Sequence, residues 1–246
     1  MRQMSLIVLI TALLGIPDRT VAQTGTGSMQ MTLSSSDGST MAGAVVPYHR
    51  VPQMTNVNGH SQLAPGEMFS GGSANSDSTG ALTIGALSPG RYVVCVQMPD
   101  LPYLDPCKWS GTLGVDIVAN QTTLLNVNLQ KGVFLRVHIN DPLSLLPPAD
   151  GNPLHFAALI VGVVVGAGGY WAADLSSVTA TGRDYIMPVP VNTALSLWLY
   201  SRSLTLSDQN GNVVNNLGAS IPFTAESNVD EVFTVNVTGT VLGTAP

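Results

Sequence analysis

Apolar and polar residues alternate in short runs along the first half of this chain. In the run at 122–129, Leu125, Val127 and Leu129 fall on one face, with Asn126 and Asn128 on the other, which is the period of a half-buried β-strand. Further runs of strand character occupy residues 29–33, 43–51, 67–71, 81–87, 91–98 and 111–119, with a polar loop after 51. Seven short runs within about 100 residues predict one Greek-key β-sandwich.

The same pattern begins again after residues 130–132. The later runs lie at 133–139, 154–165, 170–175, 183–191, 194–201, 203–208 and 231–239. Asn210-Gly211 is a signal for a two-residue hairpin, in which both turn positions take positive φ. We therefore predict an all-β protein of two tandem Ig-like or transthyretin-like sandwiches. The first spans 29–130 and the second 131–240, before a C-terminal tail at 241–246.

The stretch at 154–173 has an alternative interpretation. It holds twenty residues without a formal charge, the length of a membrane-spanning helix. Four glycines, the β-branched core at 160–165 and the glycine cluster at 166–169 favour a buried hairpin instead. No basic residue flanks the stretch to anchor a cytoplasmic end. We expect the hairpin and keep the membrane span as the weaker candidate.

The N-terminus reads as a secretory signal peptide at residues 1–22. Arg2 precedes an apolar segment at 5–16, and small residues end at Ala22, where we expect cleavage. The apolar segment is too short to span a bilayer as a helix. Residues 23–28 are expected to form a flexible N-terminus. The chain is then secreted, periplasmic or on the bacterial cell surface.

Composition and charge narrow the classes of partner. Only 10% of the residues are charged, the formal net charge is −6, and Lys108 and Lys131 are the two lysines. Nucleic acid is excluded as an expected partner, because phosphate binding relies on clustered Lys and Arg. Anionic membrane surfaces are disfavoured for the same reason.

Two turns in the first sandwich are particularly specific. Asp77 to Gly80 form a turn in which Asp bonds the backbone and Gly takes positive φ. Pro89-Gly90 has the residues of a type II turn, and Tyr92 follows it. Core residues such as Leu82 lie between the two turns.

This arrangement, D-x-x-G through L-x-P-G-x-Y, preceded by GAVV and followed by NQTTLLNVNL, resembles the carboxypeptidase regulatory-like family. The resemblance covers residues 29–130 and implies a transthyretin-like, carbohydrate-binding-like sandwich that serves as an accessory module of secreted or cell-surface proteins. Two features depart from it: the first strand lacks the family's leading Gly and Val, and no peptidase domain accompanies the module. Pilin-like relatives link a first-strand Lys to an Asn, and no lysine precedes Lys108, so this crosslink is not expected in the first sandwich.

The two cysteines, Cys95 and Cys107, are predicted to form a disulfide. Zinc needs four ligands and a redox pair favours C-x-x-C spacing, and neither pattern is present. An even cysteine count in an exported protein favours a structural bridge. Closing a loop of this length contributes about 3 kcal/mol in the chain-entropy model.

The loop between these cysteines is the candidate ligand-binding segment. Tyr103 and Trp109 lie in or beside it with three prolines, and a stiff loop loses little entropy on binding. The aromatic rings could stack on a sugar or anchor a protein partner. Alternatively, they pack beneath the loop and cover the end of the sandwich.

No catalytic, cofactor or metal site is expected. The four histidines are scattered, and no G-x-S-x-G motif is present. The leading hypothesis is a non-catalytic binding or adhesion module of the bacterial cell envelope, with a polysaccharide or an envelope protein as ligand. The alternative is a structural subunit that assembles through β-edges into a fibre or surface layer. A hydrolase with a site built from distant loops is the third hypothesis.

Overall fold

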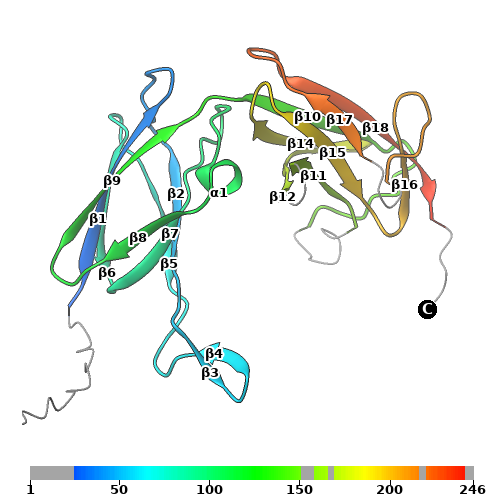
Figure 1. Cartoon of the computed structure of the whole chain (residues 1–246). Coiled ribbons are helices and arrows are strands. Elements are labelled where there is room, and N and C mark those ends of the chain that lie inside the picture. Colours follow the sequence, from blue (N-terminus) through cyan, green and yellow to red (C-terminus); the bar gives the residue numbers. More distant parts are fainter. Residues whose placement is uncertain (1–24, 151–157, 166–168, 216–219, 242–246) are drawn as a thin grey trace, which may run out of the picture.

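The computed structural model describes residues 25–150, 158–165, 169–215 and 220–241. Nearly all regular structure in these residues is β, which confirms the predicted fold class. The strands form two successive sandwiches (Figure 1). Among the described residues, no helix has the length and apolar character needed to cross a bilayer. The predicted signal peptide lies outside this part of the chain.

The first sandwich contains nine strands and one short helix. They are β1 (Gly27–Ser35), β2 (Val45–Arg50), β3 (Met54–Val57), β4 (His60–Leu63), β5 (Gly71–Asn75), β6 (Ala81–Leu87), β7 (Gly90–Val94), α1 (Pro106–Trp109), β8 (Leu113–Ile117) and β9 (Thr122–Leu129). One sheet has the order β6-β1-β9, the facing sheet has the order β5-β2-β7-β8, and β3-β4 is a separate hairpin. Alternate residues of β1 are buried, as the period of two requires.

The second sandwich is built from the remaining strands. They are β10 (Val133–Asn140), β11 (Ile160–Val165), β12 (Gly169–Ala172), β13 (Asp174–Thr179), β14 (Gly182–Val189), β15 (Ala194–Tyr200), β16 (Leu204–Ser207), β17 (Ile221–Thr224) and β18 (Glu231–Thr240). Its sheets have the orders β13-β14-β10-β18-β16 and β12-β11-β15-β17. β11 and β12 pair antiparallel, with Gly162 opposite Ala172, as the expected hairpin requires, while 154–157 and 166–168 lie outside the described residues.

The two sandwiches share one topology. The first strand of each pairs antiparallel with a middle strand and parallel with the last strand: β1 with β6 and β9, β10 with β14 and β18. The facing sheets correspond strand for strand, because β5-β2-β7-β8 and β12-β11-β15-β17 follow the same path. Each sandwich has its own apolar core, built around Met29, Met31 and Tyr92 in the first and Leu135, Met187 and Leu197 in the second.

The region predicted as a polar loop and a third strand run has a different structure. Residues 54–63 form the β3-β4 hairpin, which extends from the first sandwich (Figure 1). The apolar pair Met68 and Phe69 lies outside any strand and is 75% and 77% exposed. The strand prediction at 67–71 was wrong, because Met68 and Phe69 face solvent and not a core, and the strand begins only at Gly71.

Another local prediction also needs correction. Gly211 takes φ +83°, but Asn210 does not have positive φ. The Gly211 N–H donates to the Asp208 carbonyl and the Asp208 N–H to the Asn212 carbonyl, which describes a three-residue loop ending in a glycine bulge. The first sandwich uses the same hydrogen bonds at Asp77, Gly80 and Ala81.

Candidate functional site

The loop bracketed by the cysteines lies where the two sandwiches meet. The structure contains the Cys95–Cys107 disulfide, with an S–S distance of 2.07 Å. Asp105 caps the short helix α1, because its Oδ1 accepts a hydrogen bond from the Cys107 N–H at 2.9 Å. The Pro106 ring occupies the first turn, where no backbone donor is needed.

Tyr103 joins this loop to the first sandwich and to the junction. Its side chain is 4% exposed and belongs to the first core. The hydroxyl donates to Asp37 at 3.0 Å, and Lys131 forms an ion pair with the same carboxylate at 3.1 Å. The Ser35 hydroxyl is the largest influence that holds the pKa of Asp37 well below its ordinary value. Backbone bonds from Gly132 N–H to the Pro102 carbonyl, and from Leu104 N–H to the Gln130 carbonyl, complete the connection.

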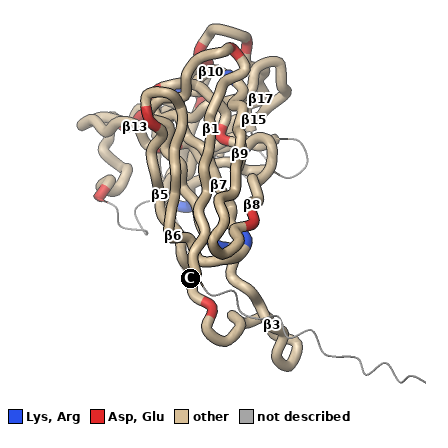
Figure 2. The backbone as a smooth tube through the Cα atoms, turned by 90° about the vertical axis from the view of Figure 1, so that its left-hand side faces the viewer, with Lys and Arg blue, Asp and Glu red and all other residues tan. Residues whose placement is uncertain are grey.

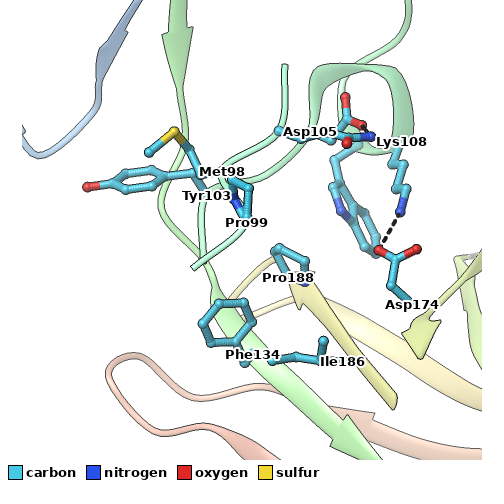
Figure 3. A pocket seen from close by; sticks show the side chains of 11 residues that line it. Met98, Pro99, Tyr103, Asp105, Lys108, Phe134, Asp174, Ile186 and Pro188 are labelled. Carbon is cyan, nitrogen blue, oxygen red and sulfur yellow. Dashed lines mark hydrogen bonds and ion pairs between the residues drawn. The ribbon is translucent and has the colours of Figure 1, made fainter. Parts of the chain in front are cut away.

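Trp109 faces the other way and packs against the core of the second sandwich. Its Nε1 is buried and has no hydrogen-bond partner among the described residues. Next to it, Lys108 Nζ lies 3.9 Å from an Asp174 carboxylate oxygen (Figure 3). Both residues line a small cavity of about 260 Å³ at the junction, together with other loop residues and with Phe134, Ile186 and Pro188 of the second sandwich. Figure 3 shows these side chains.

These contacts make the loop a brace between the sandwiches. A ring that is buried in a core cannot stack on a ligand, so Tyr103 is unavailable for the predicted binding role, and Trp109 is half-buried at the junction. Of the two alternatives for the aromatics, the structure favours packing. The sequence could not show this, because the surface that covers Trp109 belongs to the next sandwich.

The fold-defining turns have clear geometry. The Asp77 carboxylate accepts hydrogen bonds from the N–H groups of Thr79 and Ala81, at 2.8 and 3.0 Å, and Gly80 has φ +80°. Bonding to Thr79 is the largest cause that lowers the pKa of Asp77.

At Pro89-Gly90 the predicted type II turn is wrong: Gly90 has φ +143° and already begins β7, whereas that turn needs φ of about +80° at this position. Arg50 Nε donates to the Pro89 carbonyl at 3.1 Å. The Tyr92 hydroxyl donates to the Ser88 carbonyl at 3.1 Å, which ties the new strand to the turn.

Two clusters raise the question of chemistry. Ligand atoms of Cys95, Asp105 and Cys107 lie within 4.8 Å of one another. The sulfurs are joined in the disulfide and lack the thiolate charge that holds zinc, while Asp105 is used as a helix cap.

The second cluster lies in a depression of about 330 Å³ on the sheet of β14 and β10. Asp184 accepts from the Ser177 hydroxyl at 2.5 Å and contacts His138 Nδ1 at 2.7 Å. The bond from Ser177, followed by that from His138, lowers the pKa of Asp184. A nucleophilic serine must instead donate its hydrogen bond to the imidazole. Here Ser177 and His138 both contact Asp184, so His138 does not activate Ser177.

The outer face of the sheet β12-β11-β15-β17 carries an aromatic cluster that the sequence analysis did not predict. Tyr170 and Trp198 meet edge to face at 4.7 Å between ring centroids. Trp198 and Tyr200 lie 5.5 Å apart with ring planes inclined by 14°. Partial burial raises the pKa of Tyr170 to about 12, and Arg202 Nε donates to the Tyr200 hydroxyl at 2.9 Å.

A shallow groove of about 500 Å³ adjoins this cluster on the same sheet. It is lined by Val164, Ser196 and Pro222, among others, and Val164 is the register partner of Tyr170. None of the four strands contains a formally charged residue. A sequence signal for this surface existed: the strands at 160–165 and 194–200 lack the charged outward positions of an ordinary solvated sheet.

Comparison with known proteins gives no family. No family model and no curated protein matches the chain. Among solved structures, a minor pilin of Streptococcus agalactiae is 21% identical, covering 44% of this chain and 45% of its own, with a TM-score of 0.31. A streptococcal ancillary pilin is 14% identical over 87% of this chain and 63% of its own, with a TM-score of 0.38.

The major pilin subunit of Bacillus cereus is 10% identical over 82% of this chain and 83% of its own, with a TM-score of 0.30. The chain thus spans less than two thirds of the length of the first two of these pilins. These identities and TM-scores are too low to assign a family or a function.

Proposed function

We propose that this chain is a non-catalytic structural subunit of an exported assembly at the bacterial cell surface, and that it contacts neighbouring protein subunits. The observation that carries the proposal is the uncharged, aromatic outer face of β12-β11-β15-β17. Contiguous apolar surfaces on soluble proteins mark interaction sites. Tyr and Trp are enriched, and charged residues depleted, at the centre of protein interfaces.

The brace at the junction supports a structural role. The Cys95–Cys107 disulfide, the buried Tyr103 and the Lys108–Asp174 contact connect the two sandwiches through one loop. Such a connection keeps surfaces on the two sandwiches at a fixed separation. A subunit that holds its two neighbours in a fixed relative position needs this property.

The contact is expected at a sheet face and not at sheet edges. β17 contains Pro222, which cannot donate to an added strand. The edge strand β13 has a register shift between Leu175 and Ser177. Such irregularities discourage pairing with another chain. We therefore propose that the subunit associates through a sheet face and not through the β-edges expected from the sequence.

We also propose, from the sequence, how the chain is exported, where its domains lie and which family the first domain resembles. The signal peptide at 1–22 accounts for export. Residues 29–130 and 131–240 are proposed as the two domains. The first is proposed to be a carboxypeptidase regulatory-like module, an assignment supported by the D-x-x-G and P-G-x-Y turns.

The aromatic cluster also favours a second candidate function, the binding of a neutral polysaccharide. Sugar rings present C–H faces that stack on Tyr and Trp. Sedimentation velocity of the exported chain over a wide range of concentrations distinguishes the two. A structural subunit forms species larger than the monomer as concentration rises. A chain that stays monomeric at every concentration and binds neutral glycans on an array contradicts the structural proposal.

A further inference from the structure

We propose that the β3-β4 hairpin and the segment that follows it, residues 54–69, form an arm that binds the aromatic face of a second copy of this chain. The contact joins the first sandwich of one copy to the second sandwich of the next. The inference rests on the proposed function and names the partner of its contact surface.

The arm presents apolar side chains directly to solvent. Met54 on β3 is 54% exposed, Met68 is 75% exposed and Phe69 is 77% exposed. All residues of β3 and β4 are exposed, so the hairpin has no core of its own. An isolated two-stranded hairpin is at best marginally stable in water. Packing against another surface would supply the missing burial.

The base of the arm is held in one position. Arg50 donates to both carboxylate oxygens of Glu67, at 2.5 and 3.3 Å, and the Gln53 N–H donates to the same carboxylate at 3.1 Å. Both side chains of this ion pair are largely buried. A bidentate pair fixes geometry as well as charge, so Glu67, the residue before Met68, is held to Arg50 of β2. The pair also neutralises the charged residue closest to the exposed apolar side chains.

The receiving surface has matching properties. Tyr170, Trp198 and Tyr200 form the aromatic cluster, and the groove of about 500 Å³ lies beside it. Its strands carry no formal charge, and β3 and β4 carry none either. Met is adaptable and makes favourable contacts with aromatic rings. A Met-Phe pair therefore fits an aromatic cluster beside an apolar groove.

Electrostatics favours these two surfaces over others. The formal net charge of the chain is −6, so copies repel one another in general. Association is least opposed where neither surface carries an unpaired negative charge. The one acidic residue of the arm, Glu67, is paired with Arg50, and the charged residue that borders the aromatic face, Arg202, is a cation.

The position of the arm makes the contact intermolecular. Figures 1 and 2 show the hairpin extending from the first sandwich, away from β15 of the second. The two surfaces differ, so the contact is heterologous. Repetition of a heterologous contact builds an open chain or a ring and not a closed two-fold dimer.

The test uses two complementary variants of the exported chain. The arm variant carries Met68→Ser and Phe69→Ser, and the face variant carries Tyr170→Ser. Leu124→Ser and Val232→Ser replace exposed apolar residues elsewhere, at 71% and 65% exposure, and serve as matched controls. Hydrogen exchange and the intact native disulfide verify that each variant is folded.

The wild type and both controls should form large species in sedimentation velocity, whereas each variant alone should remain monomeric. An equimolar mixture of the two variants should stop at a dimer, because one partner supplies the only intact arm and the other the only intact face. If the wild type assembles and the arm variant assembles equally well, the inference fails and the proposed function stands. A wild type that stays monomeric and binds a neutral glycan, with loss on Trp198→Ala, overturns both.

Discussion

The sheets β5-β2-β7-β8 and β12-β11-β15-β17 have the same strand order and opposite surface chemistry. On the outer face of the first, Arg91 lies opposite Asp116 in the register, with 3.8 Å between their charged groups. On the second, the outer face carries Tyr170, Trp198 and Tyr200, its strands hold no charged residue, and Arg202 borders it through its hydrogen bond to Tyr200. The inner faces of both are buried and largely apolar.

A glycine makes room for the outer side chain in each sheet. A Cβ on Gly114 would lie 2.4 Å from an Arg91 guanidinium nitrogen. One on Gly162 would lie 2.4 Å from the Trp171 carbonyl oxygen and 2.6 Å from the Tyr170 ring. Glycine thus leaves space for the Arg91 guanidinium in the first sandwich and for the Tyr170 ring in the second.

This difference distinguishes the inner faces, whose apolar character the fold requires, from the outer faces, whose residues the fold does not determine. Both sandwiches require apolar inner faces, since burial of these side chains drives folding. The fold does not specify the outer face, and an ion pair there gives a solvated surface. The aromatic replacement in the second sandwich therefore points to a contact that the fold itself does not require.

The largest expected effect comes from the inner face. Leu197 is fully buried on β15, and Leu197→Ala should reduce the free energy of unfolding of the second sandwich by about 2–5 kcal/mol. Hydrogen exchange followed by mass spectrometry measures this loss strand by strand. Tyr170→Ser, on the outer face of the same sheet, should have a much smaller effect on exchange. Equal effects would mean that the outer face belongs to the fold.

Removal of the disulfide should have the next largest effect and distinguish the sandwiches. Cys95→Ala combined with Cys107→Ala should cost the first sandwich about 3 kcal/mol, because the unfolded loop gains entropy. The brace should loosen as well, so exchange should rise at 130–132 before it rises in β15. Denaturant titration with exchange readout checks this order. Unchanged protection at 130–132 would argue against the brace.

The two glycines provide a matched pair of smaller effect. Gly162→Ala should cost about 1–3 kcal/mol, since the new methyl group meets a backbone oxygen and a packed ring. Gly114→Ala should be neutral or stabilise by about 0.4–1 kcal/mol, because the Arg91 side chain can move aside. Urea unfolding of both variants gives the comparison. A reversed order would contradict the seating of Tyr170 over Gly162.

Acid should produce the smallest effect, and it should act in both sandwiches. The pKa of Asp37 is lowered chiefly by Ser35, and that of Asp208 chiefly by Asn212. A carboxyl group with a lowered folded pKa stabilises above its unfolded pKa of about 4 and loses that contribution as the pH falls. Stability should therefore fall below about pH 4, less steeply in Asp37→Asn for the first sandwich and in Asp208→Asn for the second. Identical pH profiles for variant and wild type would show that these carboxylates contribute nothing.

Local features could be predicted from the sequence because their causes lie within a few residues. The alternation of Leu125, Val127 and Leu129, the Asp77–Gly80 turn and the pairing of two cysteines are of this kind. The placement of Trp109 against the second core depends on residues far along the chain. The exposure of Met68 and Phe69 could not be predicted, since apolar residues between strands resemble another strand.

Cross-linking between copies tests the central claim most directly. Phe69→Cys in one preparation and Ser196→Cys in another introduce single thiols, while the native cysteines remain paired. After mixing and mild oxidation, mass spectrometry should find a disulfide between the introduced cysteines of the two preparations. Leu124→Cys in place of Phe69→Cys should give none. Cross-links confined to pairs of Phe69→Cys chains, or equal yields with Leu124→Cys, would contradict the docking of the arm on the aromatic face.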